Sequence, residues 1–162
     1  MEILTLGSRG PAVKLIQSLL IRIGYNPGPV DGIFGQVTRE AVREFQLDNG
    51  LEPDGVVGPA TWSRFERFLI GYDTYTIRQG DTLYNISRKY YTSLNAVMTA
   101  NPGIDPGNLR VGQVITVPYG IDVVFTDIDY TYEIMDRDIR GLKARYPFIQ
   151  VGIAGRSVLG KN

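Results

Sequence analysis

The acidic residues of this sequence that could do chemistry stand out because two of them head a repeated phrase. The stretches DGIFGQVT and DGVVGPAT begin at Asp31 and Asp54 and share the pattern D-G-x-x-G-x-x-T. A carboxylate here could act as a ligand or as a general acid or base. It could equally form a turn, because Asp-Gly favours tight turns and a glycine can precede the first residue of a helix. We expect each phrase to be a turn that leads into a helix, with threonine in the first helical turn.

The composition narrows the possible chemistry. The 162 residues include no histidine and no cysteine, so the sequence offers no imidazole for acid–base catalysis, no thiolate nucleophile and neither of the commonest zinc ligands. Basic and acidic residues number 17 each, a balance that creates no strong field for nucleic acid. Neither a signal peptide nor a run of about 20 apolar residues is visible, so no membrane span is expected. We therefore expect no catalysis, metal or cofactor in this chain.

Three helical patterns occupy residues 1–70. Proline follows glycine at Gly10-Pro11 and at Gly58-Pro59, which suits the first position of a helix. Behind these starts, and behind the phrase at Asp31, apolar residues recur at helical spacing. The expected stripes are Val13, Ile16, Leu19, Leu20 and Ile23, then Val37, Ala41 and Phe45, then Trp62, Phe65 and Leu69. The segment is predicted to form a small three-helix bundle.

Three motifs follow one another in this bundle, namely L-x-x-G-S-R-G-P-A-V-K-x-I-Q, G-Y-N-P-G-P-V-D-G-I-F-G-Q-V-T-R-E-A-V-R-E-F-Q and L-x-P-D-G-V-V-G-P-A-T-W. Their order closely resembles the peptidoglycan-binding domain found beside cell-wall hydrolases. The candidates for glycan binding are polar groups beside the loops and the second helix. They are Tyr25, Asn26, Asp31, Arg39, Arg43 and Gln46. The alternative is that the two arginines form a solvated helix face.

A different order of elements begins after residue 70. A β-prone run at Tyr75-Thr76-Ile77 precedes a helix that Asp81 or Thr82 can cap. Another helix begins at Ser93, and Val114-Ile115-Thr116-Val117 returns as a strand. This order predicts a βααβ module. With Y-T-I-R-Q-G-D-T-L at its front and A-N-P-G-I-D-P-x-N-L-x-V-G-Q-V-I-T-V-P at its back, the module resembles a LysM domain.

The LysM resemblance, which covers residues 73–118, implies binding of N-acetylglucosamine-containing polymers, either bacterial peptidoglycan or chitin. It places the sugar in a shallow groove between two loops. The candidate contacts are Gly80, Asp81, Thr82, Leu83, Asn101, Gly103, Ile104, Asp105, Asn108 and Leu109. Ile104 and Leu109 could form an apolar wall for the methyl group of an acetamido sugar. The polar members could instead serve as helix caps and turn formers.

The last segment, residues 119–162, reads as the start of another domain. A strand is expected at Ile121–Thr126, a helix over Tyr130–Arg145 and another strand at Phe148–Ile153. The helical stripe is predicted to consist of Tyr132, Met135, Ile139 and Leu142. One helix with two strands makes a poor independent core, so we expect an incomplete α/β segment.

Three motifs in this segment, Y-T-Y-E, L-K-A-R-Y-P-F and I-A-G-R-S-V-L-G-K-N, resemble the N-terminal edge of the catalytic domain in zinc carboxypeptidases. That family includes bacterial enzymes that cut γ-D-glutamyl-diaminopimelate bonds in wall peptides. The resemblance implies a longer parent protein that holds zinc, since the family's H-x-x-E motif is missing from this sequence. The alternative is a complete protein that retains a vestigial edge of such a domain.

The sequence thus predicts a multi-module α+β fold with a three-helix bundle, a LysM module and an incomplete α/β segment. The predicted function is a non-catalytic, cell-wall or spore-associated region that binds peptidoglycan and anchors a zinc-dependent wall peptidase. One rival hypothesis is a wall hydrolase that uses a carboxylate pair. Another is a coat or assembly protein that pairs with a partner or with itself through residues 119–162.

Overall fold

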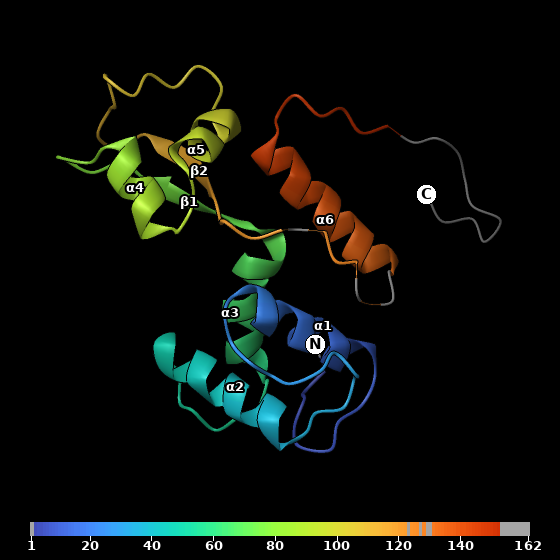
Figure 1. Cartoon of the computed structure of the whole chain (residues 1–162). Coiled ribbons are helices and arrows are strands. Elements are labelled where there is room, and N and C mark those ends of the chain that lie inside the picture. Colours follow the sequence, from blue (N-terminus) through green and yellow to red (C-terminus); the bar gives the residue numbers. More distant parts are fainter. Residues whose placement is uncertain (1, 123, 127, 129–130, 153–162) are drawn as a thin grey trace.

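The computed structural model describes residues 2–122, 124–126, 128 and 131–152. Its elements, in chain order, are α1 (Pro11–Arg22), α2 (Gln36–Asp48), α3 (Pro59–Ile70), β1 (Tyr72–Thr76), α4 (Leu83–Lys89), α5 (Leu94–Ala100), β2 (Val114–Pro118) and α6 (Tyr132–Arg145). Figure 1 shows α1, α2 and α3 gathered at one end, the βααβ unit at the other, and α6 beside them. The predicted multi-module α+β class is confirmed. Within the described residues, no helix has both the length and the apolar character needed to cross a membrane.

The core of the first module lies between α1, α2 and α3. Most of the apolar residues predicted for these helices are buried, and the rings of Phe45 and Phe65 stack with their centroids 4.1 Å apart. Val37 differs, because 56% of its surface is exposed. The buried residues of α2 are Thr38, Ala41, Val42, Phe45 and Gln46. The prediction for Val37 is therefore wrong, since the stripe of α2 begins one residue later.

A buried glutamine organises the first copy of the repeated phrase. Gln17 in α1 donates from Nε2 to Asp31 Oδ1 at 3.0 Å and to Thr38 Oγ1 at 3.2 Å. The same nitrogen reaches the carbonyl oxygen of Ile33 at 3.1 Å, and Gln17 Oε1 accepts from the backbone N–H of Gly32 at 2.9 Å. One side chain, 1% exposed, thereby fixes the turn and the first turn of α2.

The second copy repeats this network with a second buried glutamine. Gln46 in α2 donates from Nε2 to Asp54 Oδ1 at 2.8 Å and to Thr61 Oγ1 at 3.0 Å. It also donates to the carbonyl oxygen of Val56 at 2.9 Å and accepts from the backbone N–H of Gly55 at 2.8 Å. The phrase therefore occurs twice because the same glutamine-centred turn is built twice.

The repeat extends further back along the chain than the phrase itself. Each glutamine ends a similar hexapeptide, AVKLIQ in α1 and AVREFQ in α2. Gly32 and Gly55 take the same place in the two turns, with φ angles of 77° and 72°. This left-handed region strains residues that carry a Cβ atom, which accounts for glycine after each aspartate. Two successive helices thus each hold the turn that starts the next helix.

The second module is a two-stranded antiparallel sheet covered by α4 and α5. Strands β1 and β2 pair in a register that runs from Tyr72 opposite Pro118 to Thr76 opposite Val114. Its buried apolar residues are Tyr75, Ile77, Leu83, Ile86, Val97, Ile115 and Val117. The predicted strand–helix–helix–strand order is observed, although Leu94 and Met98 are 37% and 39% exposed. Helix α5 buries a narrower face than its apolar spacing indicates.

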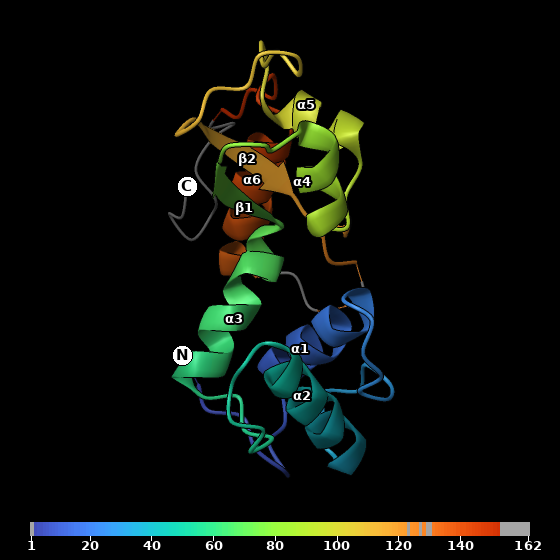
Figure 2. The same cartoon turned by 90° about the vertical axis from the view of Figure 1, so that its left-hand side faces the viewer.

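The two modules meet at a single glycine. Helix α3 ends at Gly71, which has φ 82°, and β1 begins at the next residue. The carbonyl oxygen of Gly71 accepts from the backbone N–H of Tyr119 at 2.9 Å and from Arg145 Nη2 at 2.9 Å. Figure 2 shows α3 leading directly into the sheet, with α6 behind it. The junction is short and is crossed by the chain that leaves β2.

The segment after β2 differs from the sequence-based prediction. Its helix is present as α6, but the described parts of Ile121–Thr126 and Phe148–Ile153 are not strands. A strand needs a neighbour to pair with, and the described residues offer none here. The motif I-A-G-R-S-V-L-G-K-N spans residues 153–162 and lies outside the described residues.

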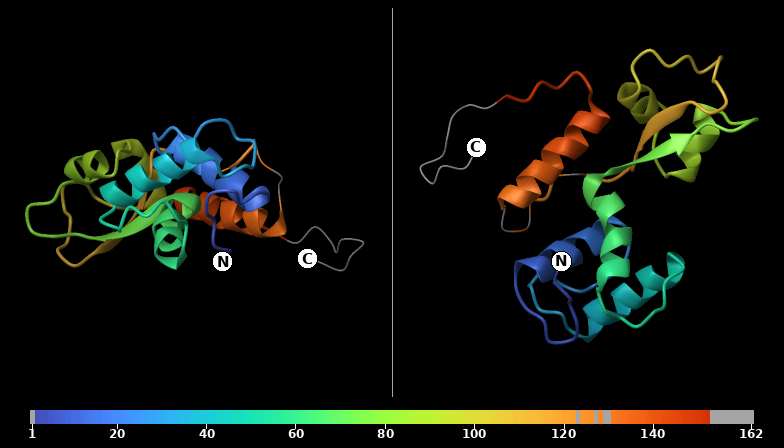
Figure 3. Two further views of the ribbon diagram at one scale, coloured as in Figure 1. Left: turned by 90° about the horizontal axis from the view of Figure 1, so that it is seen from below. Right: turned by 180° about the vertical axis from the view of Figure 1, so that it is seen from behind.

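The stripe of α6 also differs from the prediction. Tyr132 and Met135 are 47% and 37% exposed, whereas the buried residues of the helix are Ile134, Asp138 and Gly141. The reason is that α6 contacts α3, α5, β1 and β2 of the same chain, and these contacts determine which face of the helix is buried. Figure 3 shows α6 from behind, beside α3 and away from α2.

The linker before α6 is fastened to the first module. Arg22 Nη1 donates to the carbonyl oxygens of Asp122 at 3.0 Å and Val124 at 2.9 Å. The ring of Phe125 is 3% exposed and belongs to the core of that module, and the Arg22 guanidinium lies 4.0 Å from its centroid. Residues that were predicted to form a strand therefore pack as a strap across the end of α1.

Candidate functional site

The loop after β1 contains four of the predicted glycan contacts. The turn before α4 needs a φ of 85° at position 80, which glycine adopts without strain. Asp81 Oδ2 accepts from the backbone N–H of Arg78 at 2.7 Å and from the Tyr75 hydroxyl at 2.9 Å. These two hydrogen bonds, the backbone one first, hold the pKa of Asp81 below its usual range. The carboxylate is thus committed to shaping its own loop.

The next two residues of that loop are also engaged. Thr82 caps α4, since its hydroxyl oxygen accepts from the backbone N–H of Asn85 at 3.1 Å. Leu83 is 1% exposed and lies in the core of the second module. For these side chains the structure supports the cap and core roles.

Asn101 joins α5 to the sheet. Its Nδ2 donates to the carbonyl oxygens of Val97 and Thr116, both at 2.7 Å, and its Oδ1 accepts from the backbone N–H of Thr116 at 2.8 Å. The Asn101 amide donates two hydrogen bonds and accepts one inside the protein, so little of it is left for a sugar. The structure therefore gives Asn101 a role in holding the βααβ fold together.

Except for Leu109, the remaining predicted residues of the second module line a hollow of about 500 Å³. It is lined by Gly103, Ile104, Asp105, Asn108, Arg110, Val111 and Gln113. Ile104 and Leu109 both pack against the core of the module, but of the two only Ile104 lines the hollow. Asp105 Oδ1 accepts from the Gly107 backbone N–H at 2.9 Å and so shapes the loop. The loop at Gly80 does not line this hollow.

Three residues of the hollow were missed by the sequence-based prediction. Arg110, Val111 and Gln113 belong to a turn before β2, in which the backbone N–H of Gln113 donates to the Arg110 carbonyl oxygen at 3.0 Å. Val111 is 69% exposed. The sequence carried no signal for them, because the exposure of Val111 depends on the fold and single exposed apolar residues are common on protein surfaces.

In the first module, the predicted residues near α1 are partly engaged. The Tyr25 hydroxyl donates to Asp48 Oδ2 at 2.8 Å, and burial followed by this hydrogen bond raises the Tyr25 pKa. Asn26 Oδ1 accepts from the Gly28 backbone N–H at 3.3 Å. Asp31 Oδ1 also accepts from the Ile33 backbone N–H at 2.8 Å, and the hydrogen bond from Gln17 is the first cause of its lowered pKa.

The other predicted residues of this module lie on α2. Arg39 and Arg43 pass over the second turn, where a Cβ atom built on Gly55 would lie 2.7 Å from Arg39 Cγ and 3.0 Å from Arg43 Cγ. Arg43 is exposed, whereas Arg39 is half-buried and its Nε lies 3.0 Å from the same Cβ position. The prediction that Gln46 contacts glycan is wrong. Its side chain is 1% exposed, and both its amide nitrogen and its amide oxygen form hydrogen bonds inside the protein. Gln46 cannot contact a surface ligand.

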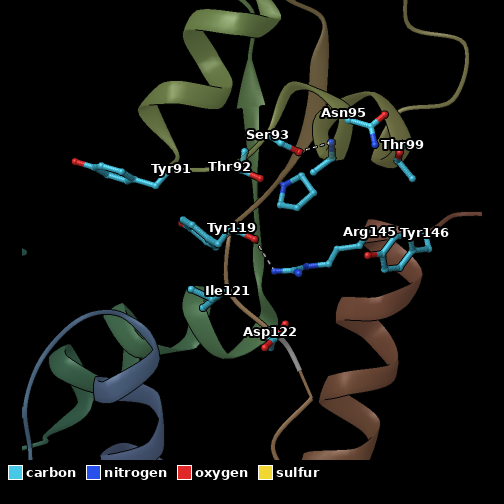
Figure 4. Close-up of a pocket in the computed structure, with 13 residues that line it drawn as sticks. Tyr91, Thr92, Ser93, Asn95, Thr99, Tyr119, Ile121, Asp122, Arg145 and Tyr146 are labelled. Atoms are coloured by element: carbon cyan, nitrogen blue, oxygen red, sulfur yellow. Dashed lines mark hydrogen bonds between the residues drawn. The ribbon is translucent and has the colours of Figure 1, made fainter.

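A further hollow of about 590 Å³ lies between the second module, the linker and α6. Figure 4 shows Ser93, Asn95 and Thr99 on one side of it and Arg145 and Tyr146 on the other. The Arg145 guanidinium donates to backbone carbonyls. Its Nη2 lies 2.7 Å from the carbonyl oxygen of Tyr119 and 2.9 Å from that of Gly71. Burial lowers the Arg145 pKa. The guanidinium therefore acts as a fastening between segments.

The residues of the chain do not fit a zinc site. Across the described residues there is no group of three or more His, Cys, Asp or Glu side chains placed to hold a metal ion. The sequence contains neither histidine nor cysteine. What the arrangement offers chemically is a set of shallow hollows with polar rims and small apolar walls, which is suited to binding.

Two family models match the chain. Residues 9–65 match the putative peptidoglycan binding domain, and residues 75–118 match the LysM domain. The resemblance to these two families is thereby confirmed.

Among relatives, a spore cortex-lytic enzyme of Halalkalibacterium halodurans is 36% identical over 66 residues, which are 41% of this chain and 20% of that enzyme. The zinc D-Ala-D-Ala carboxypeptidase of Streptomyces albus G is 43% identical over 63 residues, 36% of this chain and 24% of that protein. The solved LysM domain of a Volvox carteri chitinase is 46% identical, with 28% of this chain and 94% of that chain covered and a TM-score of 0.28. The chain spans 49% of an uncharacterized relative from Kitasatospora aureofaciens and 20% of one from Bacillus subtilis, so it covers half or less of these relatives.

Proposed function

Because residues 9–65 form a peptidoglycan-binding domain and residues 75–118 form a LysM domain, we propose that this chain is the region that anchors a bacterial wall hydrolase to its substrate. The observation that carries the proposal is the pair of wall-binding modules joined directly at Gly71. A tethered second site binds its polymer at an effective concentration in the millimolar range. Two weak sites on one short junction therefore retain the protein on an insoluble wall.

In the second module, we assign glycan contact to the hollow at residues 103–113. Ile104 supplies an apolar wall for an acetamido methyl group, and Asn108 supplies amide donors and acceptors at the rim. The loop at Gly80 and Asp81 does not line this hollow, and its contact with glycan stays a prediction from the LysM resemblance. The same chemistry suits peptidoglycan and chitin-like glycans, since both carry N-acetylglucosamine.

In the first module, we assign glycan contact to Tyr25, Asn26, Asp31, Arg39 and Arg43. Tyr25 and Asn26 lie beside the loop before the first Asp-Gly turn, and the two arginines lie on α2 over the second. Gln46 is withdrawn from this set because it is buried.

The enzyme that these modules serve is proposed to be a zinc-dependent wall peptidase in the same polypeptide. Support comes from the motifs of residues 119–162 and from relatives that include a zinc carboxypeptidase and spore cortex-lytic enzymes. We place the protein at the cell wall or the spore. The chain itself is assigned no catalytic step. Self-association through residues 119–162 is not favoured, because α6 and Phe125 pack against the chain's own modules.

The assignment of the hollow is tested by Asn108→Ala combined with Val111→Asp. Both residues are exposed, so the fold should be unaffected, while the aspartate places charge and bulk where the sugar would lie. We expect the dissociation constant for purified sacculi and for chitin to rise about 10-fold, as when one or two interface contacts are lost. Co-sedimentation isotherms measure the change.

The matched control is Arg88→Gln, an exposed residue of α4 outside the hollow. It should bind like the unmodified chain. Equal binding by the double variant and the control would remove this hollow from the glycan site.

A further inference from the structure

A separate hollow of about 590 Å³ lies at the junction of the two modules. It is formed by the C-terminal end of α1, by α3, by β1 and α4 of the second module, and by the linker after β2. None of the residues predicted to bind glycan lines it. Its lining comes from both modules and from the linker, so a ligand bound there would contact both modules.

Aromatic rings form one wall of the junction hollow. The rings of Phe68 and Tyr119 have centroids 5.0 Å apart, and Tyr90 and Tyr119 have centroids 6.0 Å apart. Phe68 comes from the first module, Tyr90 from the second and Tyr119 from the linker, so the wall exists only when the three are assembled. Burial is the first cause of a raised pKa for Tyr90 and Tyr119.

The charges around the hollow are mostly positive. Its lining includes Arg22, Arg67 and Lys89, against the carboxylate of Asp73. The Lys89 ammonium lies 5.0 Å from the Tyr75 ring centroid and 5.9 Å from that of Tyr90. Within the described part of the chain, neither Arg67 nor Lys89 forms an ion pair. The protein as a whole has no net charge, so this excess is local.

We propose that the junction hollow binds a carboxylate of a peptidoglycan stem peptide that hangs from the glycan held by the neighbouring modules. Arg67 and Lys89 attract the carboxylate from either side of the junction, and the rings of Phe68, Tyr90 and Tyr119 pack against the small apolar side chains of the peptide. Chitin carries no stem peptide and no carboxylate. The chain therefore prefers peptidoglycan to chitin. This inference rests on the proposed function and names the chemistry that selects between its two glycans.

The test compares three insoluble ligands with the full chain. They are sacculi freed of teichoic acid, the same sacculi with their carboxylates converted to neutral amides by carbodiimide and ethanolamine, and chitin. The variant is Arg67→Gln with Lys89→Gln. The control is Arg64→Gln with Arg88→Gln, which removes one charge from each of the same two helices outside the hollow.

The unmodified chain should bind intact sacculi roughly 3- to 10-fold more tightly than amidated sacculi, the range of one or two partly exposed ion pairs. The Arg67/Lys89 variant should lose this difference and keep its affinity for chitin, while the control retains it. The difference should shrink at high salt. Equal binding of the unmodified chain to intact and amidated sacculi, or equal loss in variant and control, would overturn the inference. Failure to bind any of the three ligands would instead defeat the proposed function.

Discussion

Replacement of Gln46 by leucine is expected to lower the free energy of unfolding of the first module by roughly 2–4 kcal/mol. The substitution removes four hydrogen bonds and leaves the buried backbone N–H of Gly55 without its partner, while the Thr61 hydroxyl keeps only its bond to the Val56 carbonyl oxygen. A loss of this size is a large part of the stability of a small domain. Gln17→Leu should have a similar effect, because the first network has the same design.

Trp62 makes this prediction easy to measure. It is the only tryptophan in the sequence, it is 6% exposed and it lies in the core of the first module. Its fluorescence during urea unfolding therefore reports that module alone. The control is Gln36→Leu on the same helix, where the amide reaches only the exposed Glu40. If Gln46→Leu and Gln36→Leu unfold at the same urea concentration, the turn network does not stabilise the module as described.

Replacement of Asn101 by leucine is expected to destabilise the second module by roughly 2–3 kcal/mol. Two hydrogen bonds from Asn101 to the backbone of Thr116 in β2 and one to the carbonyl oxygen of Val97 in α5 are lost, and the backbone groups of Thr116 lose their side-chain partner. The loss should appear in amide hydrogen exchange of β1 and β2, while the Trp62 transition stays in place.

Asn108→Leu serves as the control, because Asn108 is exposed in the same loop region. It should leave the exchange rates of the strands unchanged. Faster exchange in Asn108→Leu than in Asn101→Leu would contradict the assignment of Asn101 as the residue that joins α5 to the sheet.

Helices and strands of the two modules were predictable from the sequence because their signals are local. Pro11 and Pro59 mark helix starts, and the glycine at 71 allows the chain to pass directly from α3 to β1. The two Asp-Gly phrases are turns, as predicted. What spacing did not reveal is that Gln17 and Gln46 hold those turns, since a polar residue on a helix is normally expected at the surface.

The candidate site was less predictable, because one residue type can serve folding or binding. Asp81, Thr82 and Asn101 all have the polarity that a sugar requires, yet their side chains cap, bridge and shape the fold. Only the distances to backbone groups distinguish the two roles. Val111 shows the opposite case, since its exposure in a turn depends on the fold.

The segment after β2 could not be predicted from its own pattern. Ile121–Thr126 has strand-like spacing, but a strand forms only beside another strand. Phe125 finds a buried place in the first module instead, and Arg22 satisfies the linker carbonyls. The conformation of these residues therefore depends on contacts with the first module, which is distant in the sequence.

The central claim is that two joined modules hold this chain on the bacterial wall. It is tested most directly by sedimenting the purified, folded chain with an excess of insoluble sacculi and measuring the protein left in solution. We expect most of the chain to pellet with the sacculi and to be released by soluble peptidoglycan fragments. A chain with an intact Trp62 unfolding transition that stays entirely in the supernatant, with sacculi from several bacteria, would contradict the claim.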